Sequence, residues 1–368
     1  MSSILTPKFK RNFYRVLPFG FIWLILGWVF LLTETLVTGN QNLTPDSAVS
    51  MSPRIFLFAS VAVFIVGILF GIIEQIILQR RFRYYSFPRK VFFKFLIYVG
   101  FVILIVDLSF PIATSIELGL PMNDDEVIRK TLNFYSSTTF VSTVMQMSFH
   151  ILVSLIYSAI SENLGHQVLF NFFTGKYHSP KNENRIFMFL DMKDSTTLAE
   201  KLGHEVYFSL LQDYYELMSD PIISTLGEVY QYIGDEVVIT WQSERGIQNQ
   251  NCVKCYFLIK EKLDSKADYF KEKYNIVPGF KAGLHMGEVT TGEIGALKRE
   301  IIYTGDVLNT TARIQSLCNQ YDSELLISSP LIKALGMTDD KSFQQIGAIN
   351  LKGKSQKTEL YSRRSYAH

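Results

Sequence analysis

The stretch RIFMFLDMKDST at residues 185–196 decides the interpretation of the C-terminal half of the chain. Five consecutive apolar residues lead directly to Asp191, which is typical of a buried strand that ends in a carboxylate. Further along, YQYIGDEVV at residues 230–238 places Asp235 in a two-residue turn with glycine first. Because β-branched and aromatic residues flank this turn, the pattern predicts a hairpin with Asp235 at its tip.

Asp191 and Asp235 are the first candidates for chemistry. Carboxylate oxygens are the ligands that hard divalent cations prefer. Two carboxylates that share two Mg²⁺ ions can activate an attacking oxygen and stabilise a leaving phosphate. Each acid alone is also a common capping or turn residue, so this hypothesis depends on the pair and on the segments that accompany it.

The rest of this half alternates between strands and helices. Mixed elements over this length predict an α+β sandwich. We expect helices at 195–224, 249–274 and 307–319, and strands at 281–295, 301–305, 324–328, and in a final pair around 349–353 and 359–363.

The N-terminal half has the composition of a membrane anchor. Residues 1–180 carry 14 Lys and Arg against 9 Asp and Glu, whereas the remainder carries 22 against 25. The apolar runs 17–37, 55–79, 95–116 and 138–160 each reach the ~20 residues that cross about 30 Å of hydrocarbon. The first run is longer than the core of a cleaved signal peptide. The sequence therefore predicts four membrane spans.

Basic residues set the orientation of these spans. They precede the first span and fill the loop between the second and third, whereas the loop at 38–53 has none. The positive-inside rule then places both termini in the cytoplasm. We therefore expect a multi-pass protein of the inner (plasma) membrane, with the lipid bilayer as one partner and the soluble half in the cytosol.

Three ionisable residues, Glu74, Asp107 and His150, fall within the predicted spans. Such groups are costly in lipid unless they are paired or hydrated. We favour hydrogen bonds that hold the helices together over a sensing site. After the last span, residues 161–184 turn polar, and an apolar stripe of Val168, Leu169, Phe172 and Phe173 predicts a helix on which two copies pack.

Composition also excludes several classes of protein. With 14% aromatic and only 19% charged residues, the chain is not intrinsically disordered. Three cysteines cannot form a disulfide scaffold. The net charge of +2 argues against a nucleic-acid partner bound through bulk charge.

The order of the C-terminal segments resembles the catalytic domain of class III adenylate and guanylate cyclases. The resemblance covers residues 185–368 and implies a ferredoxin-like α+β cyclase domain there. From the apolar runs and the polar stretch after them, we expect this domain to follow a cytoplasmic segment at 1–16, an all-α four-helix transmembrane domain at 17–160 and a linker at 161–184. The blocks that carry it are FLDMKDST (189–196), YQYIGDEVV (230–238), KAGLHMGEVTTGEIG (281–295), GDVLNTTAR (305–313) and NLKGK (350–354).

The resemblance also implies the site residues. Asp191 and Asp235, with Met192 beside them, match the ligands of two Mg²⁺ or Mn²⁺ ions. Asn309 and Arg313 match the pair that orients the ribose and stabilises the transition state. In the family, the acids come from one chain and the Asn, Arg and Lys from its partner, so a homodimer with two equivalent sites is expected. The implied phosphate contacts are Met192, Lys193, Asp194, Ser195 and Thr196 at the triphosphate, and Lys352 or Lys354 at the terminal phosphates.

The choice of purine base is less well defined by the sequence. Where adenylate cyclases place Lys and guanylate cyclases Glu, this chain has Gln231, whose amide is both donor and acceptor. The second base-reading position is Ile302, or Thr304 or Tyr303 in another register. The leading hypothesis is an adenylate cyclase that converts ATP to 3′,5′-cyclic AMP and pyrophosphate.

Alternative functions remain. The first is a guanylate cyclase acting on GTP, and the second is a catalytically silent membrane sensor that binds nucleotide. A diguanylate cyclase is disfavoured because the second glycine and the Phe of its hairpin motif are absent. The short outer loops argue against a large extracellular ligand, and regulation through a lipid, quinone, ion or partner protein in the membrane domain stays open.

Overall fold

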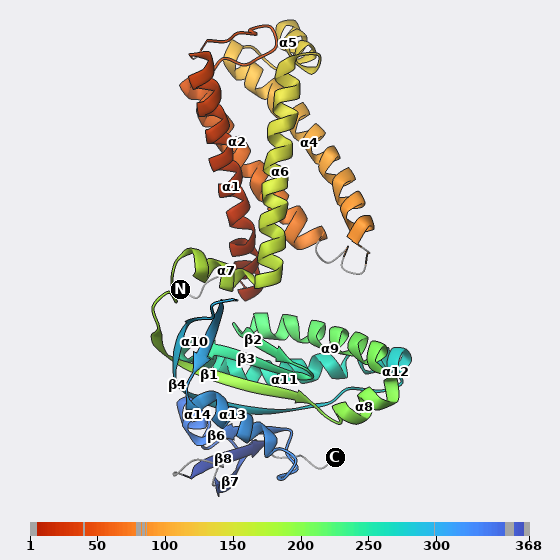
Figure 1. The fold of residues 1–368 in the computed structure, drawn as a ribbon, viewed down its shortest axis with the longest axis vertical. Helices are drawn as coiled ribbons and strands as arrows, with labels where there is room; N and C mark the ends of the chain where they lie inside the picture. Colours follow the sequence, from red (N-terminus) through yellow and green to blue (C-terminus); the bar gives the residue numbers. More distant parts are fainter. Residues whose placement is uncertain are drawn as a thin grey trace. The chain divides into compact units, whose positions relative to one another are not determined.

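The computed structural model describes residues 6–39, 41–78, 82, 85, 87–297, 299–349 and 357–363. The chain divides into two compact units (Figure 1). One unit is Phe9–Phe170, and the other combines Met1–Lys8 with Asn171–His368. The first is a helical bundle, and the second is built around a mixed β-sheet.

Within the described residues, four helices are long and apolar enough to cross a membrane. Each contains one of the four apolar runs of the sequence. Serine caps define two of the helix starts, because the side chains of Ser52 and Ser137 accept hydrogen bonds from backbone amides in the first turn. The elements are α1 (Pro7–Thr38), α2 (Pro53–Ile72) continued by the π-helical η1 (Ile73–Leu78), α4 (Phe87–Leu118), α5 (Asp125–Tyr135) and α6 (Thr138–Leu164).

The interior of this bundle is aromatic. Phe19, Trp23 and Phe70 are completely buried and pack on one another. Helices α1 and α2 approach closely at Gly67, where an added Cβ atom would lie 2.6 Å from the Phe19 carbonyl oxygen. Many large apolar side chains on the same helices remain exposed, Leu57 among them, as expected for a surface that faces lipid.

Buried polar groups link the helices of the bundle. Glu74, on the π-helical turn, accepts hydrogen bonds from Lys94, Tyr98 and Ser158. Arg15 donates to the neighbouring Gln75 at 2.7 Å, and Gln75 donates to Ser158 at 2.8 Å. All four long helices therefore contribute to a single network.

The other two ionisable groups of the spans also have partners. The Nδ1 atom of His150 lies 2.7 Å from the Gln146 carbonyl oxygen, and the ring stacks on Phe30. Asp107 accepts a hydrogen bond from Tyr135 of α5.

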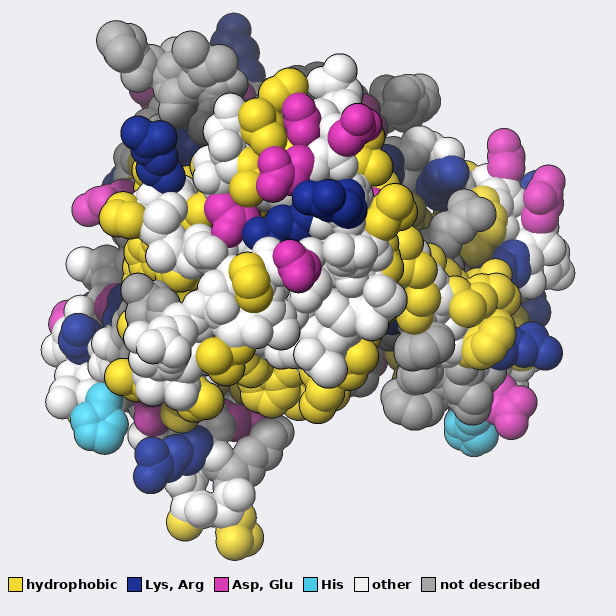
Figure 2. Space-filling model, turned by 90° about the horizontal axis from the view of Figure 1, so that it is seen from above, with side chains coloured by type: hydrophobic (Ala, Val, Ile, Leu, Met, Phe, Trp, Pro, Cys, Tyr) yellow, Lys and Arg dark blue, Asp and Glu magenta, His cyan; other side chains and the backbone are white. Residues whose placement is uncertain are grey.

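Charged side chains gather at the end of the bundle formed by α5 and its flanking loops. Figure 2 shows acidic and basic groups intermingled on this face, with hydrophobic side chains around them. Lys130 pairs with Glu117 at 2.7 Å, and Glu117 also accepts from the Ser50 backbone amide at 2.7 Å. These contacts fasten α5 and the loop that contains Ser50 to the end of α4.

The segment predicted as a linker, residues 161–184, contains the short helix α7 (His166–Phe173). Leu169 is buried within the chain, whereas Val168, Phe172 and Phe173 are exposed. Packing of two copies through the exposed members of this stripe stays a prediction.

The described residues of the second unit form an eight-stranded mixed sheet. Its order is β2-β3-β1-β4-β6-β8-β7, with β5 paired to β4. All pairs are antiparallel except β4 with β6. The strands are β1 (Lys181–Met192), β2 (Glu228–Ile233), β3 (Glu236–Gln242), β4 (Phe280–Ile294), β5 (Glu300–Thr304), β6 (Leu325–Ser328), β7 (Phe343–Ile349) and β8 (Thr358–Arg363).

Helices cover both faces of this sheet. Ile186, Met188 and Leu190 of β1 point to the larger core, which includes side chains of α9, α11 and α14. Phe187 and Phe189 point to the other face, where they pack with Val307 of α13. The helices are α8 (Ser195–Leu202), α9 (His204–Ser224), α10 (Ser243–Ile247), the 3₁₀ turn η2 (Gln248–Gln250), α11 (Asn251–Asp264), α12 (Ala267–Tyr274), α13 (Asp306–Ser316) and α14 (Ser329–Ala334).

The expected elements are present with shifted boundaries. The segment predicted as one helix at 249–274 breaks around Ser265 into α11 and α12, and α13 ends at Ser316 rather than 319. The first strand of the final pair was predicted at 349–353, whereas β7 ends at Ile349. Residues 350–356 lie outside the described part of the chain.

Helix α13 lies unusually close to β4. A Cβ atom at Gly283 would lie 2.5 Å from the Gln315 amide nitrogen, and one at Gly287 would lie 2.6 Å from Val307. Two glycines four residues apart on β4 therefore allow the helix to rest directly on the strand, and any larger residue at Gly283 would push it away.

Candidate active site

The two predicted metal-binding acids lie together at one edge of the sheet. Asp191 is near the end of β1, directly opposite Glu236 of β3, and Asp235 occupies the turn between β2 and β3. Tyr215 of α9 holds this turn, because its hydroxyl donates to the Gly234 carbonyl at 2.8 Å. Gly234 has a φ of 63°, the left-handed conformation that glycine adopts without strain.

The electrostatics of this corner are unfavourable for negative charge. Burial raises the pKa of Asp191, and the facing Asp235 carboxylate raises it further through a hydrogen bond and repulsion. Lys281 and Gln315 act in the opposite direction on that pKa. Burial, followed by repulsion from Asp191 and Asp235, raises the pKa of Glu236 to about 7.

This arrangement fits a divalent cation. Two carboxylates that contact each other need either a shared proton or a cation between them. Oxygen ligands of this type suit Mg²⁺ or Mn²⁺. Among the described residues, no group of three or more His, Cys, Asp and Glu side chains has the geometry of a metal site. Further ligands would therefore come from backbone oxygens such as that of Met192, from a bound nucleotide or from water.

Backbone amides of the following turn have different partners. The amide of Lys193 donates to the Gly279 carbonyl at 3.0 Å, and its side chain pairs with Glu324 at 2.7 Å. Asp194 has a φ of 54° and precedes α8. The amides of Ser195 and Thr196 begin that helix, and the first-turn amides of a helix have no partner within it. They are the part of the predicted triphosphate turn best placed to bind an anion.

Asn309 and Arg313 lie on α13, away from the acids of the same chain. Val307, Thr311 and Gln315 form the buried face of this helix against the sheet. Asn309 lies two residues after Val307, and Arg313 lies two residues after Thr311. Because two residues make about half a turn of an α-helix, both side chains are on the side opposite the buried face. Asn309 is exposed, and within the described part of the chain neither side chain forms a hydrogen bond or ion pair that would occupy it.

The predicted base-reading residues come from two neighbouring hairpins. Gln231 is exposed on β2 opposite Val238, next to a β-bulge. Ile302 pairs with Gly292 on the β4–β5 hairpin, where the Thr304 hydroxyl donates to the Thr290 carbonyl at 3.2 Å. The alternative Tyr303 packs in the sheet against Phe187 and the Arg185 guanidinium. Lys352 and Lys354 lie outside the described residues.

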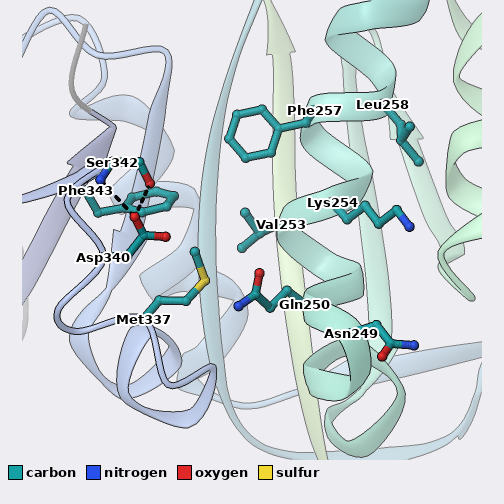
Figure 3. A pocket seen from close by; sticks show the side chains of 10 residues that line it. All are labelled: Asn249, Gln250, Val253, Lys254, Phe257, Leu258, Met337, Asp340, Ser342 and Phe343. Carbon is teal, nitrogen blue, oxygen red and sulfur yellow. Dashed lines mark hydrogen bonds between the residues drawn. The ribbon is translucent and has the colours of Figure 1, made fainter. Parts of the chain in front are cut away.

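A separate cavity of about 310 Å³ lies between α11 and the segment that connects α14 to β7 (Figure 3). Val253 and Phe257 of α11 face Met337 and Phe343 across it. None of its lining residues belongs to the predicted site. It is therefore distinct from the corner that carries Asp191.

Comparison with known proteins places this geometry in a family. The family model "Adenylate and Guanylate cyclase catalytic domain" matches residues 177–362. The chain belongs to this family. The predictions of class III membership and of the cyclase fold are confirmed. Members of the family generally depend on divalent metal ions.

Two curated relatives come from Rhizobium meliloti (strain 1021). Adenylate cyclase 2 is 35% identical over 203 residues, which are 55% of this chain and 56% of that protein. Adenylate cyclase 1 is 26% identical over 180 residues, 47% of this chain and 26% of that protein. The chain thus spans about half the length of the first relative and a quarter of the second.

A solved structure supports the fold. The structure of a bacterial light-regulated adenylyl cyclase aligns with a TM-score of 0.52 and 22% identity, over 59% of this chain and 63% of that chain.

The sequence did not identify the side chains that surround the acids. Lys281 lies 3.5 Å from Asp191, Gln315 donates to the same carboxylate, and Tyr215 holds the turn of Asp235. For Gln315 a signal existed, since it continues the four-residue spacing of the buried face of α13. Tyr215 gave no signal, because its partner is a backbone carbonyl.

Proposed function

We propose that this protein is a membrane-anchored adenylate cyclase that converts ATP to 3′,5′-cyclic AMP and pyrophosphate in a homodimer. The observation that carries this proposal is the contact between Asp191 and Asp235, which favours a cation over two free charges. Membership of the cyclase family supports it. The proposed organisation is a membrane domain at 17–160, a linker at 161–184 and a catalytic domain at 185–368.

In the proposed reaction, Asp191 and Asp235 would hold two Mg²⁺ or Mn²⁺ ions. When bound, such ions make the ribose 3′-hydroxyl a better nucleophile and offset charge on the pyrophosphate. The 3′-oxygen forms a bond to the α-phosphorus as the bond to pyrophosphate breaks, and the hydroxyl proton leaves to solvent. Asn309 would orient the ribose, and Arg313 would stabilise charge on the α-phosphoryl group.

The position of Arg313 supports shared sites. It faces away from the acids of its own chain, so it would serve the site of a second copy, as the family resemblance implies. Each dimer would then contain two equivalent sites. Lys352 or Lys354 would contact the terminal phosphates, and the first turn of α8 would bind the triphosphate.

The four apolar helices would anchor this dimer in the inner (plasma) membrane. By the positive-inside rule, the basic loops would put both termini in the cytoplasm, on the side of the nucleotide substrate. A ligand or partner in the membrane domain would regulate turnover.

A guanylate cyclase is the second candidate. Gln231 offers both a donor and an acceptor, and Ile302 adds no polar group that would select adenine. This candidate uses the same acids, Asn and Arg, and differs only in the base.

The proposal is tested by turnover of the purified full-length protein in detergent with Mn²⁺, offered ATP and GTP in parallel. Cyclic AMP from ATP supports the adenylate cyclase. Cyclic GMP alone supports the second candidate. No product from a folded dimer favours a catalytically silent sensor and contradicts both.

Shared sites are tested by mixing two inactive variants. An Asp191→Ala chain paired with an Arg313→Ala chain retains one complete site, because the intact acid and the intact arginine come from different chains. Recovery of part of the wild-type turnover is expected, and no recovery would contradict a shared site.

A further inference from the structure

Gln315 is buried beside the metal-binding corner. Only 6% of its surface is exposed, and its side-chain amide donates to the Oδ2 atom of Asp191 at 3.1 Å. Lys281 of β4 lies 3.5 Å from the same oxygen. One carboxylate oxygen of Asp191 is therefore held from two elements, α13 and β4.

The backbone of Gln315 has little freedom to move. A Cβ atom added at Gly283 would lie 2.5 Å from the amide nitrogen of Gln315, so the helix and the strand are in direct contact at this residue. Ile314 and Cys318 on either side of it are buried in a small core with Leu326 and Leu360. A shift of the Asp191 carboxylate is therefore opposed by the whole helix rather than by one mobile side chain.

The same helix carries Arg313, two residues before Gln315 and on its opposite side. In the proposed dimer this arginine belongs to the site of the partner copy. Helix α13 thus has one side chain on the acids of its own chain and another directed to the other active site.

We propose that Gln315 is a positioning residue that fixes Asp191 for cation binding and, through α13, couples each cation site to the Arg313 that serves the other site of the dimer. The inference rests on the proposed cyclase function. Hydrogen-bond partners of ligating carboxylates commonly change metal affinity by about 10- to 100-fold. Coupling between distinct sites typically amounts to about 5- to 150-fold.

The first experiment measures binding of Mn²⁺ alone to the full-length dimer in detergent, from the electron paramagnetic resonance signal of free Mn²⁺. Gln315→Met keeps the side-chain volume and removes the donor. We expect its dissociation constant for Mn²⁺ to rise by about 10- to 100-fold. The matched control is Thr311→Val, which removes a polar group from the same buried face of α13, one turn away, where the Thr311 hydroxyl donates to the Val307 carbonyl of its own helix. Its Mn²⁺ affinity should equal that of the wild type.

An unchanged Mn²⁺ dissociation constant in folded Gln315→Met would overturn the positioning role. If this variant does not fold, Gln315→Asn replaces it, since its amide is one methylene short of Asp191. This measurement needs no turnover, so it separates failure of the inference from failure of the proposed function. Weak binding in wild type and no cyclic product would instead count against the cyclase itself.

The second experiment isolates the coupling with two mixed dimers, each of which has one complete site. In the first dimer, an Asp235→Ala chain is paired with an Arg313→Ala chain. The arginine of its complete site comes from the Asp235→Ala chain, which keeps the bond between Asp191 and Gln315. In the second dimer, an Asp191→Ala chain is paired with an Arg313→Ala chain, and the arginine comes from the Asp191→Ala chain, which lacks this bond. We expect the second dimer to have a kcat lower by at least about fivefold at saturating Mn²⁺.

Gln315→Met, added to the chain that supplies the arginine, completes a double-mutant cycle. It should lower kcat in the Asp235→Ala pair and have no effect in the Asp191→Ala pair, where the bond is already absent. Equal kcat in both pairs, or an equal loss in both on adding Gln315→Met, would overturn the coupling.

Discussion

Two acids, the buried Glu74 of the helical bundle and the partly buried Asp191 of the sheet unit, have opposite surroundings. Glu74 accepts hydrogen bonds from Lys94, Tyr98 and Ser158, so its charge is neutralised within its own unit. Asp191 faces a second carboxylate, and among the described residues the cation that pairs with it is Lys281, at 3.5 Å. The first arrangement is complete, and the second requires a ligand.

The difference separates an acid whose partners are in place from one that is proposed to bind a cation. A buried charge with its partners in place stabilises a particular packing and becomes costly only when one partner is removed. Two carboxylates in contact lower the stability of the empty fold, and such an arrangement is typical of a site that binds a cation or shares a proton.

The largest effect is expected from Asp191→Ala. Loss of a metal ligand removes several kcal/mol of transition-state stabilisation, so turnover should fall by at least about 10³-fold. The melting temperature of the catalytic unit should not fall, because a repulsive contact with Asp235 disappears. Cyclic nucleotide formation and circular dichroism melting measure the two effects. Normal turnover would contradict the metal assignment, and a large loss of stability would make Asp191 structural like Glu74.

Glu74→Ala should show the reverse pattern. It leaves the partly buried Lys94 without its partner, and the cost should approach the ~3–5 kcal/mol that breaking a fully buried pair carries. The bundle should therefore unfold at a lower temperature in detergent, while the dimers that remain folded keep their turnover. Glu34→Ala is the matched control, since Glu34 is on an exposed part of α1. Equal stability of the two variants would show that the Glu74 network contributes little.

The fold was predictable because each element has a local signature. The strand before Asp191 is a run of buried apolar residues, and Gly234 marks the hairpin turn. The break at Ser265 was missed because the apolar pattern of α11 and α12 continues across it. The position of α13 on the second face of the sheet depends on Gly283 and Gly287, whose role appears only when the strand and the helix are brought together.

The site was predictable only in part. Asp191 and Asp235 could be assigned as a pair from their places at a strand end and a turn. The raised pKa of Glu236 could not be predicted, because it depends on burial and on two neighbours, Asp191 and Asp235, from different segments of the chain. The partners of Asp191 are similarly non-local, since Gln315 follows it by 124 residues. A sequence pattern identifies ligands more readily than the groups that position them.

A smaller effect is expected at Gln231, which tests the base and leaves the acids untouched. Gln231→Lys should raise the preference for ATP over GTP, and Gln231→Glu should lower it, each by about tenfold, the worth of roughly one hydrogen bond. The ratio of kcat/KM for the two nucleotides measures the shift. Because Gln231 is exposed on β2, the melting temperature serves as the control and should not change. An unchanged ratio in both variants would exclude Gln231 as the residue that reads the base.

The smallest effect concerns pH and tests directly whether the acids repel one another in the empty site. The pKa of Glu236 is about 7 in the fold and 4.5 ordinarily, so between these values the folded state binds protons more tightly than the unfolded chain. Stability of the metal-free protein should therefore increase as pH falls from about 7.5 to 5.5. Glu236 is partly exposed, which reduces the effect, and we expect a rise in melting temperature of roughly 2–4 °C.

The cation reverses this trend, and the reversal is what distinguishes the empty site from a merely buried acid. With saturating Mn²⁺ the carboxylates are held ionised, so protonation competes with binding and the melting temperature should fall over the same pH interval. Glu236→Gln should flatten the metal-free profile, whereas Glu74→Gln should leave it unchanged, because Glu74 lies in the other unit and has its own cation. A metal-free slope that is unchanged in Glu236→Gln would assign the titration to another group, such as Asp191, whose pKa is also raised by burial and by Asp235, and would contradict the role given to Glu236.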